Sequence, residues 1–373
     1  MGVVMKYPYD AELAAALALR ETVPIAQLEE ARREHERYFS FARDDLSGGD
    51  RLRINDRTVP AGPHGPPVRV RVFTPYLLEP PVPAVLYIHS GGFVLGSIES
   101  EHRFAANAAT EAEAIVVSVG YRLAPEHPYP AALNDCYAAF LWMVSSSAEL
   151  GLDPERIAVI GSSAGGGLAA GLALLARDHG GPSPCFQLLN MPVLDDRLDT
   201  PSMLAFTDTP VWNRGSAVLS WEYYLGEDRQ DVPYYAAPAR APDLSGLPPA
   251  YISTAEFDPL RDEGLTYALR LLQAGVSVEV HNFAGTFHSF DVVESAELSQ
   301  RQVAESHAAL RRGLRASHIK PESRSSASLL EAPVASVLPT RTNSRPSPRS
   351  RTPKRQTNNT GTSSPRTRQR RPS

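Results

Sequence analysis

The chain has 373 residues, of which 42% are hydrophobic and 21% are charged, an ordinary composition for a globular protein. It contains no apolar run of about 18 residues, so we expect no membrane span. Two cysteines, Cys136 and Cys185, are too few for a disulfide framework and lack the spacing of metal ligands. The net charge of −5 conceals an asymmetry: residues 317–373 carry 12 Lys and Arg against 2 Asp and Glu, whereas residues 1–316 carry 25 against 40.

The basic segment 317–373 is predicted to be a disordered tail. It has no Phe, Tyr or Trp and is rich in Ser, Thr, Pro and Arg, so it cannot bury enough apolar surface to offset its conformational entropy. We expect a solvated appendage or a misread end of the coding frame. Nucleic-acid contact is an alternative, but basic composition alone supports it weakly; it would rest on Arg366, Arg368, Arg370 and Arg371.

Two helices are predicted near the N-terminus, at residues 10–20 with Asp10 as N-cap and at residues 24–38. The first apolar stretch is interrupted by Glu12 and lacks the basic start and cleavage pattern of a signal peptide. Lys6 also stands where a myristoylation site needs Ser or Thr. We therefore expect a cytoplasmic protein, in which residues 1–45 form N-terminal lid helices.

Residues 46–316 alternate between strand and helix patterns. Short apolar runs predict strands at 51–59, 68–74, 84–89, 114–120, 156–161, 185–190, 250–254 and 277–283. Helical patterns between them cover 103–112, 131–145, 164–177, 261–274 and 292–315. This alternation predicts an α/β fold, a mostly parallel sheet with helices on both faces. A Pro- and Gly-rich turn joins the first two strands, which favours an antiparallel edge.

The segment at about 195–235 fits no strand–helix unit. It is rich in aromatic residues, among them Trp212, Trp221, Tyr223 and Tyr224. We interpret it as an insertion above the sheet that packs with the N-terminal helices to complete a lid.

The first chemical signal is a G-x-S-x-G motif at Gly161–Gly165. It follows a predicted strand and opens a predicted helix, the context of a nucleophile elbow, in which a tight turn lifts the serine hydroxyl out of the sheet. A Gly-rich helix start that merely packs closely is the alternative. The context favours Ser163 as a nucleophile.

A second Gly-containing loop, His89–Phe93, also follows a strand. Glycines allow backbone N–H groups to converge on a developing oxyanion. Gly91 and Gly92 are therefore candidate donors, together with the N–H of Ala164. A phosphate-binding loop would need a P-loop Lys or a second spaced Gly, and neither is present.

A nucleophilic serine needs a base, and the base needs an orienting carboxylate. His288 lies in a loop directly after the last predicted strand. Asp258 follows the strand at 250–254, at the carboxyl end where catalytic groups collect, whereas Asp262 is better explained as a cap of the next helix. The chain order Ser163, Asp258, His288 is the order of α/β-hydrolases.

Five motifs then stand in one order: HSGGF at 89–93, YRLAPEHPYPAAL at 121–133, GSSAGG at 161–166, FDPLRDEG at 257–264 and GTFHSF at 285–290. In these the chain resembles the hormone-sensitive-lipase-like esterases, the bacterial family IV carboxylesterases of the α/β-hydrolase fold, over about residues 10–315. The resemblance implies Ser163 as nucleophile, Asp258 as acid and His288 as base. It also implies an oxyanion hole from the N–H groups of Gly91, Gly92 and Ala164, a lid, and no metal or cofactor.

Two positions depart from the family pattern. Ser90 replaces the first glycine of HGGG, which predicts altered loop packing and not loss of the hole. Ser162 replaces the acid of GDSAGG, which removes a charge beside the elbow.

Trp212 and Phe93 are candidates for lining the substrate pocket, although Trp212 is as often a core residue. Arg122 and Glu126 are expected to fix loops beneath the site through buried or half-buried ion pairs, and Asp135, Asp195 and Asp196 are expected to be structural or capping groups.

The predicted function is a serine carboxylesterase for short- to medium-chain esters. An amidase or formamidase with the same triad is the alternative among hydrolases, and a non-catalytic ligand receptor on the same fold is the alternative outside them. The expected partner is a small-molecule ester. By resemblance, a homodimer through the last strand and helix is possible.

Overall fold

The computed structural model describes residues 6–18, 23–40, 51–60, 65–226 and 230–315. The predicted tail at 317–373 and residues 41–45 of the predicted lid lie outside them. In the described part, strands form an eight-stranded sheet in the order β1-β2-β4-β3-β5-β6-β7-β8. The strands are β1 (Leu52–Val59), β2 (Val68–Pro75), β3 (Val82–Ile88), β4 (Ile115–Gly120), β5 (Leu152–Ser162), β6 (Phe186–Asn190), β7 (Ala250–Phe257) and β8 (Val278–Phe287).

The predicted mixture of pairings is confirmed. β1 pairs with β2, and β2 with β4, in antiparallel fashion, while the pairs from β4 through β3 to β8 are parallel. The central strands are buried almost throughout because helices cover both faces, which is why they appear in the sequence as continuous apolar runs.

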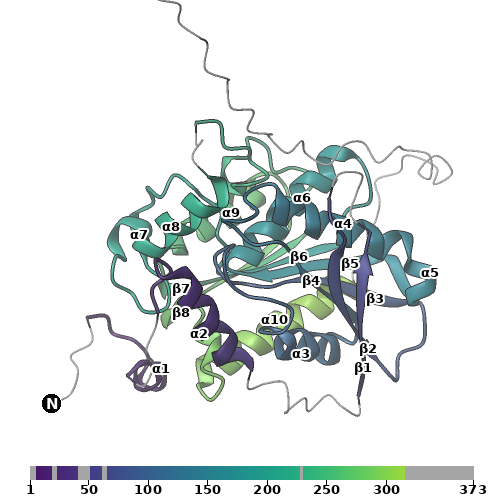
Figure 1. Ribbon diagram of the computed structural model, residues 1–373, viewed down its shortest axis with the longest axis horizontal. Helices are drawn as coiled ribbons and strands as arrows, with labels where there is room; N and C mark the ends of the chain where they lie inside the picture. Colours follow the sequence, from purple (N-terminus) through teal and green to yellow (C-terminus); the bar gives the residue numbers. More distant parts are fainter. Residues whose placement is uncertain (1–5, 19–22, 41–50, 61–64, 227–229, 316–373) are drawn as a thin grey trace, which may run out of the picture. The chain divides into compact units, whose positions relative to one another are not determined.

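Helices lie on both faces of the sheet (Figure 1). One face is covered by α3 (His102–Ala112) and α10 (Glu297–Arg315), and the other by α4 (Ala131–Ser145), α6 (Ala164–His179) and α9 (Arg261–Gln273). A short helix, α5 (Ser147–Leu150), leads into β5. Each face has its own apolar cluster, so the sheet separates two cores. The sites discussed below lie at the carboxyl ends of the parallel strands.

The last helix begins later than its sequence pattern predicts. Residues Phe290–Val292 form a 3₁₀ turn, η2, and α10 starts only at Glu297. The ring of Phe290 is fully buried in a cluster with Leu13 and Phe283. Ser289 before it has a left-handed backbone with φ of 57°. These tertiary contacts override the helical pattern of the sequence.

The two N-terminal helices occupy different places. In α1 (Ala11–Leu17) the Asp10 side chain accepts hydrogen bonds from the Glu12 and Leu13 N–H groups, as predicted for an N-cap. Leu13 is fully buried against Phe283 and Phe287, so α1 packs beside β8. The second helix, α2 (Leu28–Ser40), starts four residues later than predicted, because Pro24 opens a turn closed by the Gln27 N–H.

The aromatic insertion contains α7 (Pro201–Ala205) and α8 (Arg214–Leu225), and the 3₁₀ turn η1 (Pro238–Arg240) follows it. Trp221 and Tyr224 of α8 are buried in the core. The N-terminal segment contacts the insertion at Asp208, whose carboxylate lies 2.8 Å from Lys6 Nζ and 2.7 Å from the Tyr7 hydroxyl.

Ion pairs fix the loops near the strand ends, as the sequence predicts. Arg122 donates three hydrogen bonds to the buried Asp135 carboxylate. Arg32 of α2 pairs with Glu126 at 2.7 Å and also donates to the Val94 and Ala124 carbonyl groups. Asp195 and Asp196, predicted to be structural or capping groups, form ion pairs with Arg197 and Arg240.

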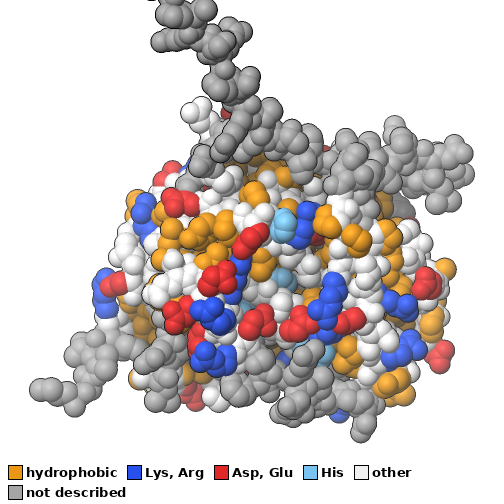
Figure 2. Space-filling model, in the orientation of Figure 1, with side chains coloured by type: hydrophobic (Ala, Val, Ile, Leu, Met, Phe, Trp, Pro, Cys, Tyr) orange, Lys and Arg blue, Asp and Glu red, His pale blue; other side chains and the backbone are white. Residues whose placement is uncertain are grey.

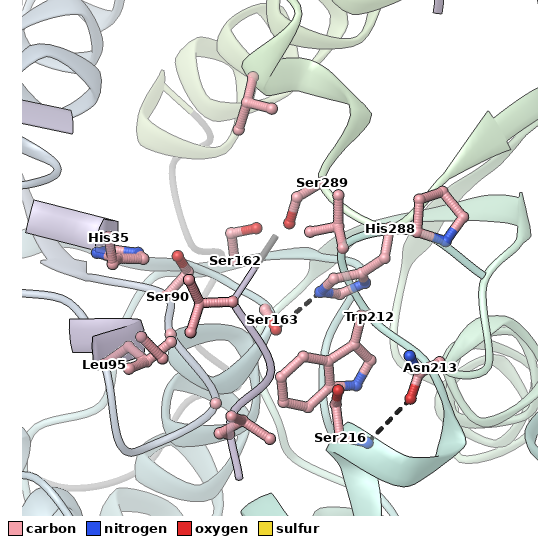
Figure 3. A pocket seen from close by; sticks show the side chains of 18 of the residues that line it. His35, Ser90, Leu95, Ser162, Ser163, Trp212, Asn213, Ser216, His288 and Ser289 are labelled. Atoms are coloured by element: carbon pink, nitrogen blue, oxygen red, sulfur yellow. Dashed lines mark hydrogen bonds between the residues drawn. The ribbon is translucent and has the colours of Figure 1, made fainter. Parts of the chain in front are cut away.

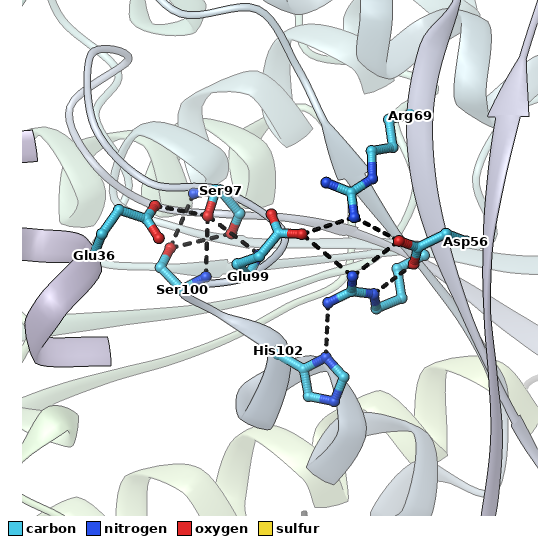
Figure 4. Close-up of polar contacts among 8 residues, drawn as sticks. Glu36, Asp56, Arg69, Ser97, Glu99, Ser100 and His102 are labelled. Atoms are coloured by element: carbon cyan, nitrogen blue, oxygen red, sulfur yellow. Dashed lines mark hydrogen bonds and ion pairs between the residues drawn. The ribbon is translucent and has the colours of Figure 1, made fainter. Parts of the chain in front are cut away.

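A polar network ties the sheet edge to the loop before α3 (Figure 4). Arg71 of β2 is buried and donates to Asp56 of β1, to Glu99 and to His102 Nδ1. Hydrogen bonds from Arg71 and Arg69 lower the pKa of the Asp56 carboxyl group. Ser97 extends the network to α2 through a 2.7 Å bond to Glu36.

Acidic and basic side chains are intermixed on the face shown in Figure 2. Within the described residues, none of the helices is long and apolar enough to cross a bilayer. The same residues contain no group of three or more His, Cys, Asp or Glu arranged to hold a metal ion.

Candidate active site

The turn between β5 and α6 holds Ser163 in a strained conformation, with φ of 55° and ψ of −120°. The flanking glycines are sterically required. A Cβ atom at Gly161 would overlap the Gly165 backbone, and one at Gly165 would overlap the Ile88 carbonyl group of β3. The Ser163 N–H donates to the Asn190 carbonyl at 2.8 Å. This is the geometry of a nucleophile elbow.

Three polar side chains from separate strand ends meet at this turn. His288 Nε2 lies 3.0 Å from Ser163 Oγ, and His288 Nδ1 lies 2.7 Å from Asp258 Oδ2. All three residues are at most 3% exposed. The second carboxylate oxygen of Asp258 accepts the Leu260 N–H at 2.9 Å. The carboxylate therefore orients the imidazole with Nε2 free to accept the serine proton.

Asp262 has a different role from the predicted one. The helix α9 has no side-chain cap, and Leu260 occupies its N-cap position. The Asp262 carboxylate instead accepts the Ser202 N–H at 2.7 Å, in the first turn of α7. It thus ties α7 of the insertion to α9 and does not cap its own helix.

The loop after β3 bends sharply at two glycines with positive φ, 114° at Gly91 and 59° at Gly92. A Cβ atom at Gly92 would lie 2.6 Å from the Trp212 ring. The Gly92 carbonyl accepts a 2.7 Å bond from the buried Ser220 hydroxyl of α8. Ala164 begins α6, so its N–H belongs to the first turn, where backbone donors lack intrahelical partners.

A buried carboxylate that sequence reasoning missed anchors this loop. Glu101 is 4% exposed and accepts hydrogen bonds from the Ser90 N–H at 2.8 Å, from the Ser90 hydroxyl and from the Tyr87 hydroxyl at 2.7 Å. Burial raises the pKa of the Glu101 carboxyl group. The Ser90 N–H is thereby engaged, which leaves the next two N–H groups of the loop as candidate oxyanion donors.

A cavity of about 470 Å³ opens above Ser163 and His288 (Figure 3). Its walls come from the candidate oxyanion loop (His89–Phe93), the 209–219 part of the insertion, and the turn and helix at 23–35. The lining includes Ile25, His35, Leu95 and Leu219. The first predicted helix, residues 10–20, does not contribute to this lining in its described part, whereas the second does.

The two predicted pocket residues have different surroundings. Trp212 lines the cavity, is 7% exposed, and its ring centroid lies 5.9 Å from that of His288, so it is both packed and pocket-facing. Phe93 is 1% exposed and stacks on Tyr224 at 3.9 Å, away from the cavity lining. Its φ of 65° turns the ring into the core, which the sequence motif does not reveal.

A family model described as the alpha/beta hydrolase fold matches residues 85–292, which is more than half of the chain. The match spans the oxyanion loop, the elbow and the three hydrogen-bonded side chains. The chain belongs to the α/β-hydrolase fold family. Within this family it is a member of the hormone-sensitive-lipase-like branch, as its motifs predict.

Relatives and solved structures within the family are similar over most of the chain. Carboxylesterase NlhH of Mycobacterium tuberculosis is 47% identical over 71% of this chain and 84% of its own length. A structure named Bacterial Heroin Esterase is 51% identical with a TM-score of 0.81, and covers 83% of this chain and 99% of that one. Esterase LipW from Mycobacterium marinum is 40% identical with a TM-score of 0.75, and covers 83% and 97%.

Proposed function

We propose that this α/β-hydrolase is a serine carboxylesterase that hydrolyses short- to medium-chain carboxylic esters. The observation that carries the proposal is the hydrogen-bonded chain from Ser163 through His288 to Asp258, with separations of 3.0 and 2.7 Å, at the floor of a cavity. The names of the relatives, carboxylesterase and esterase, support the same class of reaction.

Acylation follows from this geometry. Ser163 Oγ attacks the ester carbonyl carbon while His288 Nε2 takes the hydroxyl proton. Asp258 holds the Nδ1–H tautomer and stabilises the imidazolium that forms. The tetrahedral oxyanion lies against the N–H groups of Gly91, Gly92 and Ala164, which need no reorganisation because the loop and helix already hold them.

Acylation ends when the alcohol departs, and deacylation then repeats the same steps with water. His288 donates its proton to the departing alkoxide, the alcohol leaves, and the acyl group stays on Ser163. His288 then takes a proton from water, whose oxygen attacks the acyl carbon. The bond between that carbon and Ser163 Oγ breaks, His288 returns the proton to Oγ, and the acid is released. The reaction balances without a cofactor.

Residues 23–35 and 209–219 would form the lid over the site, since both line the cavity. Its apolar members favour the acyl or alcohol chain of an ester. The cytoplasmic location, a homodimer through β8 and α10, and nucleic-acid contact by residues 317–373 stay predictions from the sequence.

The first test is hydrolysis of p-nitrophenyl esters from acetate to palmitate. Replacing Ser163 by Ala removes the nucleophile, and we expect turnover to fall by about 10⁶-fold with the fold intact. Substantial activity in Ser163→Ala would overturn the assignment. Binding without turnover of any ester or matched anilide by folded wild-type protein would favour a receptor, and faster anilide hydrolysis would favour an amidase.

The second test separates Asp258 from its neighbour. Asp258→Asn favours the wrong imidazole tautomer, so we expect kcat to fall by about 10⁴-fold. Asp262→Asn is the matched control, because Asp262 bonds to Ser202 and not to His288, and it should retain kcat within about threefold. Equal losses in the two variants would contradict the role of Asp258.

A further inference from the structure

A second chamber adjoins the catalytic cavity beneath the nucleophile elbow. Its volume is about 240 Å³, far above the ~15 Å³ that holds one water molecule. It lies between α3, α10 and the ends of β5 and β6. Four residues line both spaces: Tyr87, Phe104, Ser162 and Asp291. The catalytic cavity and the chamber are therefore adjacent, and these four side chains form the wall between them.

Ser162 lies at the junction of the two spaces. Its hydroxyl makes no hydrogen bond with another side chain in the described residues, and Figure 3 shows it beside Ser163 at the cavity wall. The family pattern has an acidic residue at this position. Serine is shorter and uncharged, so it leaves both room and a free hydroxyl at the threshold of the chamber.

The chamber walls carry buried hydrogen-bond acceptors that lack partners among the described residues. Asp291 lines both spaces, and within the described residues its Oδ1 atom is buried without a hydrogen-bond partner. Gln302 of α10 is fully buried, and its Oε1 atom likewise lacks a partner among those residues. An unsatisfied buried polar atom costs about 1–3 kcal/mol. Such acceptors are stabilised by a group that donates hydrogen bonds.

The charges exclude an anionic occupant. Glu294 at the outer rim pairs with Arg103 of α3, so that guanidinium is already engaged. Asp291 has no ion-pair partner in the described part of the chain. Burial raises the pKa of the Asp291 carboxyl group and lowers that of His307, which leaves a neutral imidazole on the wall. A hydroxyl group, which is neutral and donates, fits these walls.

We propose that this chamber is a subsite for a hydroxyl-bearing arm of the ester, either on its acyl or on its alcohol side. The inference rests on the proposed esterase function. The hydroxyl donates to the acceptors around Asp291, and Ser162 leaves the passage open. The enzyme therefore prefers hydroxylated esters over their plain counterparts on one side of the scissile bond.

Two substrate pairs test the subsite and identify the arm. The acyl pair is p-nitrophenyl butyrate and p-nitrophenyl 3-hydroxybutyrate, and the alcohol pair is ethyl acetate and 2-hydroxyethyl acetate, followed by acid release. We expect kcat/KM at least about fivefold higher for the hydroxylated ester in one pair, in keeping with one added hydrogen bond. Equal rates in both pairs would overturn the proposal.

A plugging variant locates the effect. Val303 of α10 lines the chamber but not the catalytic cavity, so Val303→Phe fills the chamber alone. Ala304→Phe changes the next residue of the same helix, which is exposed, and adds the same ring outside the chamber. We expect Val303→Phe to abolish the preference while p-nitrophenyl acetate turnover stays within twofold, and Ala304→Phe to keep it. A preference that survives Val303→Phe would overturn the proposal. If the wild-type protein did not hydrolyse p-nitrophenyl acetate at all, the proposed esterase function itself would be overturned.

Discussion

The nucleophile elbow and the oxyanion loop face each other across the site, but they are held in different ways. The elbow is fixed by close backbone packing. A Cβ atom at Gly161 would overlap the Gly165 backbone, one at Gly165 would overlap the Ile88 backbone of β3, and Ser163 is strained between them. The oxyanion loop is held by hydrogen bonds to side chains from outside it, among them the buried carboxylate of Glu101 and the Ser220 hydroxyl. The elbow therefore depends on steric contacts with backbone atoms, whereas the oxyanion loop depends on hydrogen bonds with side chains.

This difference predicts that the elbow tolerates substitutions less well than the oxyanion loop does. In Gly165→Ala the new methyl group overlaps the backbone of β3, which cannot rotate away. We expect at least about 3 kcal/mol loss of stability and at least about 10²-fold loss of kcat from displacement of Ser163. Chemical denaturation and p-nitrophenyl acetate kinetics measure the two effects.

Gly181→Ala is the matched control for this change. Its Cβ atom would lie 3.9 Å from the Tyr137 hydroxyl, in ordinary contact. We expect Gly181→Ala to have the stability and activity of the wild-type protein. If Gly165→Ala behaved like Gly181→Ala, the steric account of the elbow would be wrong.

The oxyanion loop should weaken in a graded way when its anchor is changed. Glu101→Ala leaves the Ser90 N–H and the Tyr87 hydroxyl without their acceptor, so we expect a 10- to 100-fold loss of kcat with little change in KM. Glu101→Gln keeps an acceptor oxygen and should recover most of this loss. A rise in KM alone, or no recovery with Gln, would contradict a positioning role.

The pH dependence of stability gives an independent readout of Glu101. Burial raises the pKa of the Glu101 carboxyl group above its ordinary value of 4.5, so the folded protein holds a proton that the unfolded chain releases. Stability from this group is therefore present at low pH and is lost as the pH rises above about 4.5 through the folded-state pKa. Glu101→Gln removes this loss, so its stability relative to wild type should increase over that window. A constant difference across pH would contradict a raised pKa.

The sequence predicts the elbow well because the motif that marks it lies within five residues, Gly161–Gly165. The same holds for the strand ends that carry Asp258 and His288, since apolar runs and the residues after them mark those positions directly. The parallel sheet is predictable because its strands are apolar runs buried on both faces. The antiparallel edge is predictable because a short turn joins the first two strands.

Contacts over long range were missed for physical reasons. No pattern connects Glu101 to Ser90, because the intervening loop brings them together only in three dimensions. Asp262 bonds to a residue 60 positions away, and Phe93 turns into the core through a positive φ. The late start of α10 likewise depends on the packing of Phe290. Each feature depends on a tertiary contact or backbone conformation that local propensity cannot express.

The smallest expected effect comes from Ser90, where the two anchoring bonds can be separated. Ser90→Gly restores the family glycine and removes the hydroxyl bond to Glu101, but it keeps the backbone N–H bond at 2.8 Å. If the N–H bond holds the loop, kcat for p-nitrophenyl acetate should fall by only about two- to threefold. A loss as large as that of Glu101→Ala would mean that the hydroxyl is the main anchor. In that case the serine would compensate for the lost glycine through its side chain, and the oxyanion loop would depend on Glu101 through a contact that the family glycine cannot make.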